Sequence, residues 1–567
     1  QGMIPRAGRR SSRLPNTTSK MHEIHTKTCT GVPLEAVKCI SGFGEISKDY
    51  AAYLTDESKY PGGKAEELFF PRDEAELSIV FKKMASSGIP VTIAGARTGL
   101  VGGCVPLRGA LVSLESMNEI HQVYYDECAE EWRVRAQCAV SLAELNRCLM
   151  SGSFAWIEKH GTEEIRSQLV RFKNDPNNYL YPPDPTELSA SLGGTVATNA
   201  SGARTYRYGA TRNWVRRIRV MLPNGELLDI PRGKYFASPS GEFIIYDSTD
   251  RPLYLKTPSY SLPATKNTAG IFTGPNMDLI DLFIGSEGIF GAVTAIDVAL
   301  LKREEKISII QFVDSDDKAF DLVEALRTQK AIPLDFLELY SEEAIKILRG
   351  RQKKDPKGVS MPPIPAHVGA AVFFEFSFQS DSSSTDYPAI VDAVGRCGAD
   401  VRNSWAAYEP RELNRFKTFR HILPETVNAL IAERKKQHPG LHKLGTDLAV
   451  PGNHLREMWR IYTKKLRAAG MQWLAFGHVG DNHVHVNILP RDMDELKQGL
   501  ELYRELAFEA VRLGGTVSAE HGIGKIKAPY LKAMFTTEQI QQMKDIKQTL
   551  DPLGILNPGD MFVVGLS

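Results

Sequence analysis

The sequence lacks any closely spaced pair of cysteines. No Cys-x-x-Cys motif occurs, which excludes a zinc ribbon and a ferredoxin-type iron–sulfur cluster, because both need neighbouring thiolates. Reduced thiols in a reducing compartment are the simplest interpretation. The seven cysteines are scattered over the chain, at positions 29, 39, 104, 128, 138, 148 and 397.

Long apolar runs and an excess of one charge are also missing. No stretch of about eighteen apolar residues occurs, so the sequence predicts no membrane-spanning helix, and it contains no apolar signal-peptide core. The formal net charge is only +1, which argues against a surface that binds nucleic acid. With 42% apolar and 24% charged residues, the composition is that of an ordinary globular protein.

The first twenty residues contain no acidic side chain. This composition cannot form a core, so residues 1–20 are expected to be a disordered basic tail. The tail faintly resembles an organellar transit peptide, but its apolar face is thin, and a flexible tail or a remnant ahead of Met3 is favoured. We therefore expect a cytoplasmic location, with a mitochondrial or peripheral membrane location as the alternative. The basic residues of the tail are Arg6, Arg9, Arg10, Arg13 and Lys20.

The chain from about residue 67 is predicted to alternate strand and helix. Strand-like segments at 68–70, 89–94 and 110–114 accompany a predicted helix at 73–87. The glycines of Gly95-Ala-Arg-Thr-Gly-Leu-Val-Gly-Gly103 would let backbone N–H groups approach a pyrophosphate. This loop is not a Walker loop and does not match G-x-G-x-x-G, so a Rossmann NAD site is disfavoured.

Two further loops of small residues follow. Ser189-Ala-Ser-Leu-Gly-Gly-Thr-Val-Ala-Thr-Asn-Ala-Ser-Gly202 has few bulky side chains, so it suits a flat ligand lying against backbone better than a packed core. Gly285-Ser-Glu-Gly-Ile-Phe-Gly291 comes after a strand-like segment at 282–284. The three loops predict one extended ligand that is contacted repeatedly, and three unrelated turns are the alternative.

Histidines gather in the segment 476–489, Phe-Gly-His-Val-Gly-Asp-Asn-His-Val-His-Val-Asn-Ile-Leu. Here His483, His485 and Asn487 alternate with apolar residues, which is the period of a half-buried strand. His478 stands just before a glycine-containing turn, so it can fold back toward His485. The polar face of this strand therefore predicts a site rather than a core.

Glu520 and His521 occur in Gly514-Gly-Thr-Val-Ser-Ala-Glu-His-Gly-Ile-Gly524, where the glycines allow two adjacent side chains to reach one space. His478, His485 and Glu520 make up two imidazoles and a carboxylate, the ligand set of an open catalytic metal site, most often zinc. His521 is then free to move a proton. For each histidine alone, a hydrogen-bonded core position is the alternative, and no helical His-Glu-x-x-His motif occurs.

The order of these motifs resembles the FAD-linked oxidases of the vanillyl-alcohol oxidase superfamily. The shared elements are the first glycine-rich loop, Pro-Asp-Pro, Gly-Gly-Thr-Val-Ala-Thr-Asn-Ala-x-Gly, Gly-Ser-Glu-Gly, His-x-Gly-Asp-x-His-x-His-x-Asn, Glu-His-Gly-Ile-Gly and Leu556-Asn-Pro-Gly559. The branch most similar contains D-lactate dehydrogenases, D-2-hydroxyglutarate dehydrogenases and the glycolate oxidase FAD subunit. The resemblance spans roughly residues 60–563.

The resemblance implies an α+β fold. It implies a two-subdomain FAD-binding domain of the PCMH type at 21–300, a cap domain with an antiparallel sheet at 301–505, and a C-terminal return to the FAD domain at 506–567. Covalent members of the family attach FAD through a histidine in the first glycine-rich loop, and none occurs there, so noncovalent FAD is expected. The implied cofactor residues are Gly95, Ala96, Arg97, Thr98, Gly99, Gly102, Gly103, Pro183, Asp184, Ser189, Gly193, Gly194, Thr195, Asn199, Gly202, Glu287 and Asn557.

Within the cap we expect strands at 307–313 and 370–377, a helix at 317–330 and an exposed loop at 349–365. The segment 416–426 resembles the family segment whose arginine grips a substrate carboxylate. That residue is Arg420 here.

Lys443, just before a strand-like segment at 448–450, matches a second family position that contacts the acid. Either Arg420 or Lys443 could instead be an ordinary surface charge. Two departures stand out: Pro424 replaces a threonine of some D-2-hydroxyglutarate dehydrogenases, and His483 replaces an asparagine of many relatives. The first puts a preference for a second carboxylate in doubt, and the second adds either a ligand or a hydrogen bond.

The functional hypothesis is oxidation of a D-2-hydroxy acid of the D-lactate or D-2-hydroxyglutarate type. The metal would lower the pKa of the substrate hydroxyl, His521 would take its proton, and the C2 hydride would go to flavin N5. Arg420, Lys443 and Asn487 would hold and orient the acid. The alternatives are a transferase like alkyl-dihydroxyacetonephosphate synthase and a noncatalytic electron-relay subunit.

The expected partners follow from this hypothesis. They are a small 2-hydroxy acid and an external electron acceptor, namely a flavoprotein, a quinone or a cytochrome, because no second redox motif is found in the sequence. No nucleic acid is expected to bind, and a homodimer is left open.

Overall fold

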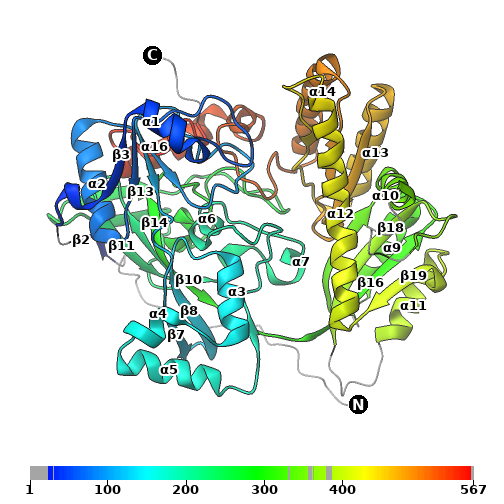
Figure 1. The fold of residues 1–567 in the computed structure, drawn as a ribbon, viewed down its shortest axis with the longest axis horizontal. Helices are drawn as coiled ribbons and strands as arrows, with labels where there is room; N and C mark the ends of the chain where they lie inside the picture. The colour runs from blue at the N-terminus through cyan, green and yellow to red at the C-terminus, as the bar shows by residue number, and fades with distance from the viewer. Residues whose placement is uncertain are drawn as a thin grey trace.

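The computed structural model describes residues 23–29, 31–329, 332–354, 361, 363–378 and 386–562. The tail expected at 1–20 lies outside these residues. Within them, helices and strands combine in an α+β fold, as predicted. Figure 1 shows two bodies: one contains the blue, cyan and red segments, and the other contains the yellow and orange segments. No helix in the described ranges has the length and apolar character needed to cross a membrane.

A four-stranded mixed sheet opens the first body, in the order β3-β4-β6-β5. The predicted helix is α2 (Glu74–Ser87). It begins where the Asp73 side chain accepts the backbone N–H of Glu76, and it ends at Gly88 in the left-handed conformation. Its face with Leu77 and Phe81 is buried. The strands are β3 (Lys38–Ser41), β4 (Glu67–Phe70), β5 (Val91–Ala94) and β6 (Ala110–Ser113).

A six-stranded antiparallel sheet forms the second layer of this body, in the order β2-β11-β10-β14-β8-β7. Burial alternates along β8, which is the pattern of a sheet with one packed face. Its strands are β2 (Lys27–Thr28), β7 (Ile120–Asp126), β8 (Glu131–Gln137), β10 (Val215–Met221), β11 (Glu226–Pro231) and β14 (Ala292–Ala299). Smaller sheets join β1 (Ile24–His25), β12 (Glu242–Tyr246) and β13 (Pro252–Lys256), and join β9 (Tyr179–Leu180) to β15 (Leu301–Lys302).

Several short helices belong to the first body, and one of them is formed by the second small-residue segment. The segment 189–202 forms α6 (Leu192–Ala197), which begins where the Ser191 hydroxyl accepts the N–H of Gly194. The other helices of this body are α1 (Phe43–Asp49), α3 (Leu142–Ser151), α4 (Ala155–His160), α5 (Glu163–Lys173), α7 (Thr205–Tyr208) and α8 (Ile280–Phe283).

The second body is built on a seven-stranded sheet, ordered β19-β16-β18-β17-β21-β22-β20, whose paired strands are antiparallel. This confirms the antiparallel sheet expected in the cap. Both faces are covered: along β16, Phe312 packs with α10 and α12, and Ile309 belongs to the core on the other side. The strands are β16 (Glu305–Val313), β17 (Leu334–Tyr340), β18 (Ala370–Phe378), β19 (Ser404–Ala407), β20 (Leu444–Gly445), β21 (Trp473–Gly477) and β22 (His485–Ile488).

The helices of the second body pack around this sheet. In Figure 1 the long helix α12 runs the height of the body, with α13 to its right and α14 at its upper end. Pro424 lies inside α12, where a proline cannot donate the helical bond to the carbonyl of Arg420. The helices are α9 (Asp316–Thr328), α10 (Glu342–Lys354), α11 (Asp386–Arg396), α12 (Pro410–Lys435), α13 (Leu455–Ala468) and α14 (Met493–Arg512).

The chain then crosses back to the first body. Helices α15 (Leu531–Met534) and α16 (Thr537–Leu550) follow; Figure 1 shows α16 in the first body, where it contacts β13. The N–H of Val91 in β5 donates to the carbonyl of Ile555 (2.8 Å), and the N–H of Asn557 donates to the carbonyl of Val91 (2.8 Å). The last described segment therefore extends the first sheet.

Three sequence expectations are wrong. The segment 282–284 is not a strand, because 280–283 form the single helical turn α8, and short apolar runs do not distinguish the two. Only Ala449 in 448–450 makes bridges, to His483 and Thr516, so no strand forms there. The loop expected at 349–365 is helical up to Lys354, because its polar residues lie on the outer face of α10. Residues 355–360 and 362 lie outside the described ranges.

Candidate active site

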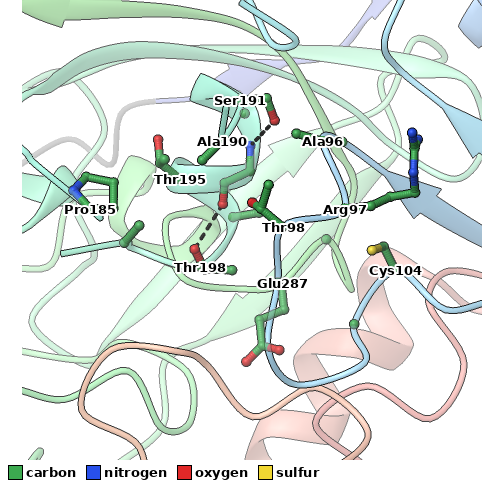
Figure 2. Close-up of a pocket in the computed structure, with 18 of the residues that line it drawn as sticks. Ala96, Arg97, Thr98, Cys104, Pro185, Ala190, Ser191, Thr195, Thr198 and Glu287 are labelled. Atoms are coloured by element: carbon green, nitrogen blue, oxygen red, sulfur yellow. Dashed lines mark hydrogen bonds between the residues drawn. The ribbon is translucent and has the colours of Figure 1, made fainter. Parts of the chain in front are cut away.

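One cavity lies where the three small-residue loops meet the histidine-rich segments. More than half of its lining residues are Gly, Ala, Ser or Thr. Figure 2 shows Ala96 and Thr98 of the first loop across from Ser191 and Thr195, with Glu287 of the third loop below them. His478, Glu520 and His521 also line this cavity. The loops expected to share one ligand therefore do surround one space.

Close backbone contacts explain the glycines of the first two loops. A Cβ on Gly95 would lie 2.7 Å from the Ser191 hydroxyl, and one on Gly193 would lie 2.6 Å from the Cβ of Cys138. Atoms do not approach this closely without displacement, so a side chain at either position would separate the segments. The cavity wall thus depends on glycine backbone packed directly against Ser191 and Cys138.

Glu287 ties three separate segments together. Its buried carboxylate accepts the N–H groups of Ile523 (2.7 Å) and Gly524 (2.6 Å), and its carbonyl accepts the side-chain amide of Asn557 (2.8 Å). Burial raises the pKa of Glu287, although these N–H donors oppose the shift. The residue therefore anchors the Glu-His-Gly loop against the cavity.

Two imidazoles meet the Glu520 carboxylate. His478 Nε2 lies 3.3 Å from Oε1, and His485 Nε2 lies 3.4 Å from Oε2. Two donors held tetrahedrally by one zinc ion, each at about 2.1 Å, are separated by about 3.4 Å. The turn Val479–Asp481 folds His478 back onto the strand, as expected, and the rings of His478 and His485 are 5.5 Å apart. The donor set and its spacing fit a divalent metal.

A lysine shares this carboxylate. The Lys266 ammonium contacts Glu520 Oε1 directly and is almost fully buried. The hydroxyl of Ser201 also donates to Oε1 (3.4 Å). Burial raises the pKa of Glu520, but Lys266 and the three surrounding histidines outweigh that effect and lower it well below its usual value. Glu520 is therefore an anion, as a metal ligand must be.

Glu338 supports both an imidazole and a guanidinium. Its Oε1 accepts a hydrogen bond from Arg420 (2.8 Å) and lies 3.2 Å from His478 Nδ1. Burial would raise the pKa of Glu338, but Arg420 and His478 together lower it to about 2. A carboxylate behind the outer nitrogen of His478 leaves Nε2 as the nitrogen that faces Glu520.

Asp447 is the anion at the base of the Glu-His-Gly loop. Its oxygens accept the N–H groups of Glu520 (3.1 Å) and His521 (3.0 Å), and its Oδ2 lies 3.3 Å from His521 Nδ1. Lys527 Nζ (2.6 Å) and the Ser518 hydroxyl (2.8 Å) also donate to it. His521 Nε2 is thereby left as the ring nitrogen that can exchange a proton at the cavity.

A second group of donor atoms consists of Asp447, His483 and Glu520. Its carboxylate Asp447 is already bound to Lys527 and to several N–H and O–H groups. The group of His478, His485 and Glu520 is therefore the better candidate for a metal site.

Two models of known protein families match this chain. The family model "FAD linked oxidases, C-terminal domain" matches residues 302–561, and the model "FAD binding domain" matches 65–163 and 167–231. Together they cover well over half of the chain. The chain belongs to the FAD-linked oxidase family.

Individual relatives of this FAD-linked oxidase align over nearly the whole chain. A D-lactate dehydrogenase of Anaerostipes hadrus is 28% identical over 530 residues, covering 91% of this chain and 93% of the relative. A D-2-hydroxyglutarate dehydrogenase of Stutzerimonas stutzeri is 24% identical over 523 residues, covering 90% and 94%. A solved structure of alkyldihydroxyacetonephosphate synthase has a TM-score of 0.58 at 14% identity, covering 94% of this chain and 89% of that chain, which is a likeness of fold.

The cavity of this FAD-linked oxidase fits the flavin cofactor of the family. Its wall of glycines and small side chains leaves room for a flat ring system, and its exposed backbone suits a diphosphate. Most of the expected cofactor residues line the cavity. They are Gly95, Ala96, Arg97, Thr98, Gly99, Gly103, Gly193, Gly194, Thr195, Gly202, Glu287 and Asn557.

The other five expected cofactor residues do not line the cavity. The Gly102 carbonyl accepts Lys525 Nζ (3.1 Å), and Asn199 accepts the N–H of Arg212 (2.9 Å). Asp184 binds the backbone N–H and the guanidinium of Arg204. Pro183 is buried beside Asp184, and Ser189 is exposed.

Arg97 faces away from the cavity centre. Its guanidinium lies 4.2 Å from the Tyr53 ring and 3.6 Å from Glu115, and Figure 2 shows it extending away from Thr98.

The three expected substrate contacts, Arg420, Lys443 and Asn487, do not line the cavity. Asn487 is buried two residues beyond His485 on β22, on the same side of the strand. Lys443 precedes β20, which pairs with β22, and burial alone lowers its pKa. Their role as substrate contacts therefore stays a prediction.

Three residues at the centre were missed by sequence reasoning: Lys266, Glu338 and Asp447. Each comes from a segment far from the histidines, on a loop, on β17 or after β20. A weak signal exists for Glu338, since an acid inside the strand Leu334–Tyr340, all of whose residues are buried, requires a cationic partner.

Proposed function

We propose that this FAD-linked oxidase oxidises a D-2-hydroxy acid of the D-lactate or D-2-hydroxyglutarate type to the 2-oxo acid, with the help of a divalent metal, zinc being the best fit. The observation that carries the proposal is the meeting of His478, His485 and Glu520 in one group of donor atoms, of which His478 and Glu520 line the flavin cavity. The names of the aligned dehydrogenases support the substrate class.

Noncovalent FAD, when bound, would supply the hydride acceptor. Gly95–Gly103 and α6 would hold it through backbone contacts, and Asn557 and Glu287 would keep the third side of the cavity in place. A metal at the histidine pair would make the substrate hydroxyl more acidic.

His521 would take the proton of the hydroxyl at Nε2. Asp447 faces its other ring nitrogen, so the ring is held in one orientation and the emerging positive charge meets a buried anion. His521 is a cavity residue and Asp447 lies behind it, which makes Asp447 a positioning residue.

Arg420 would receive the substrate carboxylate. A guanidinium can present two parallel N–H groups to a carboxylate, and Glu338 already fixes one of its nitrogens at 2.8 Å. Lys443 and Asn487 are proposed as further contacts of the acid.

Electrons would leave to an external acceptor, a flavoprotein, a quinone or a cytochrome. Homodimer formation and a cytoplasmic location, with a mitochondrial or peripheral membrane location as the alternative, belong to the same proposal. A lipid-ether transferase would share the fold but would not need two imidazoles on a carboxylate.

Anaerobic bleaching of the bound flavin tests the function. A panel of D- and L-2-hydroxy acids is mixed with the flavoprotein before and after chelator treatment, and with His485→Gln beside His442→Gln, a histidine on the exposed surface. We expect bleaching by D-acids only, with loss after chelation and in His485→Gln but not in His442→Gln. Bleaching by L-acids alone, or indifference to the chelator, would contradict the proposal.

A further inference from the structure

Lys266 occupies an unusual position for an ammonium group. Only 6% of its side chain is exposed, and it stands beside the carboxylate that we propose as a metal ligand. Its Nζ contacts Glu520 Oε1 and donates to the Gly202 carbonyl at 3.4 Å. A divalent ion at His478 and His485 would therefore meet a positive charge already bound to its carboxylate ligand.

A second carboxylate lies on the other side of this ammonium. Asp481 Oδ2 is 3.6 Å from Lys266 Nζ, and the Asp481 side chain is 14% exposed. Among the described residues, Oδ2 has no hydrogen-bond partner. Burying a carboxylate oxygen without a hydrogen-bond partner costs free energy, so a cation that moves closer to Oδ2 would be stabilised there.

The turn that carries Asp481 is firmly held. Asp481 ends the 3-10 turn Val479–Asp481, and its N–H donates to the carbonyl of His478 at 3.0 Å. Arg327 binds the carbonyl of Gly480 (2.6 Å) and the side chain of Asn482 (2.8 Å). The acceptor therefore stays in place while the lysine, with its flexible stem, is the part that can move.

We propose that Lys266 is the internal counter-ion of the metal-free site and shifts from Glu520 toward Asp481 when a divalent cation binds. The inference rests on the metal site of the proposed function. In the metal-free protein, Lys266 neutralises the Glu520 carboxylate, which would otherwise be a buried charge without compensation. In the metal-bound protein, the ammonium moves away from the ion and satisfies the unpartnered oxygen of Asp481.

The arrangement sets the metal affinity. Because Lys266 stabilises the metal-free state and opposes the arriving cation, it lowers the affinity of the site. Asp481 acts in the opposite direction, since it gives the displaced ammonium a partner. The two effects are coupled, because the ammonium that Asp481 receives is the one that leaves Glu520.

Zinc affinity of the FAD-loaded protein tests this coupling. Chelator-treated protein is titrated with Zn²⁺ in competition with a chromophoric chelator, for the wild type, Lys266→Met, Asp481→Asn and the double variant. Lys256→Met, an exposed lysine at the end of β13, controls for loss of one charge. His485→Gln identifies the binding measured as that of the proposed site.

We expect Lys266→Met to bind Zn²⁺ about tenfold more tightly or better, Asp481→Asn to bind several-fold more weakly, and Lys256→Met to match the wild type. In the Lys266→Met background, Asp481→Asn should have a clearly smaller effect than in the wild type. The melting temperature should also rise more on Zn²⁺ addition in Lys266→Met than in the wild type.

Equal or weaker affinity in Lys266→Met would overturn the inference, as would an Asp481→Asn effect of the same size in both backgrounds. If Lys266→Met does not fold, unchanged affinity in Asp481→Asn alone would overturn it. These outcomes leave the proposed function intact. Absence of Zn²⁺ binding in the wild type, or binding that survives in His485→Gln, would instead remove the metal site and both proposals with it.

Discussion

Replacing Asp447 by asparagine should both destabilise the protein and disturb the site. The carboxylate is 1% exposed and forms an ion pair with Lys527, whose side chain is 8% exposed. Oδ1 accepts the N–H of Glu520, and Oδ2 accepts the N–H of His521. Whichever way the amide of an asparagine is placed, its NH₂ group faces a donor.

The expected cost follows from the buried charge that would remain. Removing one partner of a buried ion pair typically costs about 3–5 kcal/mol, because the other charge is left without compensation. We therefore expect Asp447→Asn to lower the free energy of unfolding by about this amount in the transition that includes the site. Turnover should also fall, since the backbone that carries Glu520 and His521 loses one of the two side-chain acceptors that hold it.

Urea unfolding, followed by flavin fluorescence, measures the effect. Lys527→Met in the Asp447→Asn background removes both charges, so the double variant should lose clearly less than the sum of the single variants. Asp545→Asn, on the exposed face of α16, serves as the charge control. A loss below about 1 kcal/mol in Asp447→Asn, or strict additivity with Lys527→Met, would refute the reasoning.

Three shorter predictions follow. Gly193→Ala should lower flavin content and melting temperature, because its Cβ would meet Cys138, whereas Gly44→Ala, whose Cβ meets nothing within 4 Å, should do neither. Arg420→Lys should raise KM for the hydroxy acid about tenfold or more with flavin content unchanged, because the planar fork is lost, and an unchanged KM would contradict its role. Burial lowers the pKa of His121, so the imidazole binds a proton less readily in the folded protein than in the unfolded chain. The free energy of unfolding should therefore fall as the pH drops through about 6.5, and it should fall less in His121→Gln. Equal melting curves of both proteins between neutral and mildly acidic pH would exclude this contribution.

Patterns within short stretches of sequence predicted those parts of the site that are formed by a single short stretch. The alternation after His483 predicted the strand β22, and the glycines of 95–103 predicted a loop that borders a binding space, where the structure places a cavity. The return of His478 toward His485 could be expected because a turn of few residues separates them. In each case the forces that set the conformation act within about ten residues.

Contacts between distant segments could not be predicted in this way. Lys266 and Glu520 are 254 positions apart, and Arg420 and Glu338 are 82 apart, so only the assembled fold brings their charges together. The helical turn α8 was missed for a related reason. Its backbone conformation is stabilised by Arg212, which donates to the carbonyl of Asp281 from 69 positions away.

The return of residues 555–557 to the first sheet has a consequence for biosynthesis. Asn557 accepts the N–H of Ile93 and donates to the carbonyl of Glu287, so one wall of the flavin cavity is made from residues that a ribosome adds after the whole cap. While translation is still passing through the cap, the nascent amino-terminal half has an incomplete cradle. Loading of the cofactor is therefore a late event in the life of each molecule, and truncated translation products should be recovered colourless.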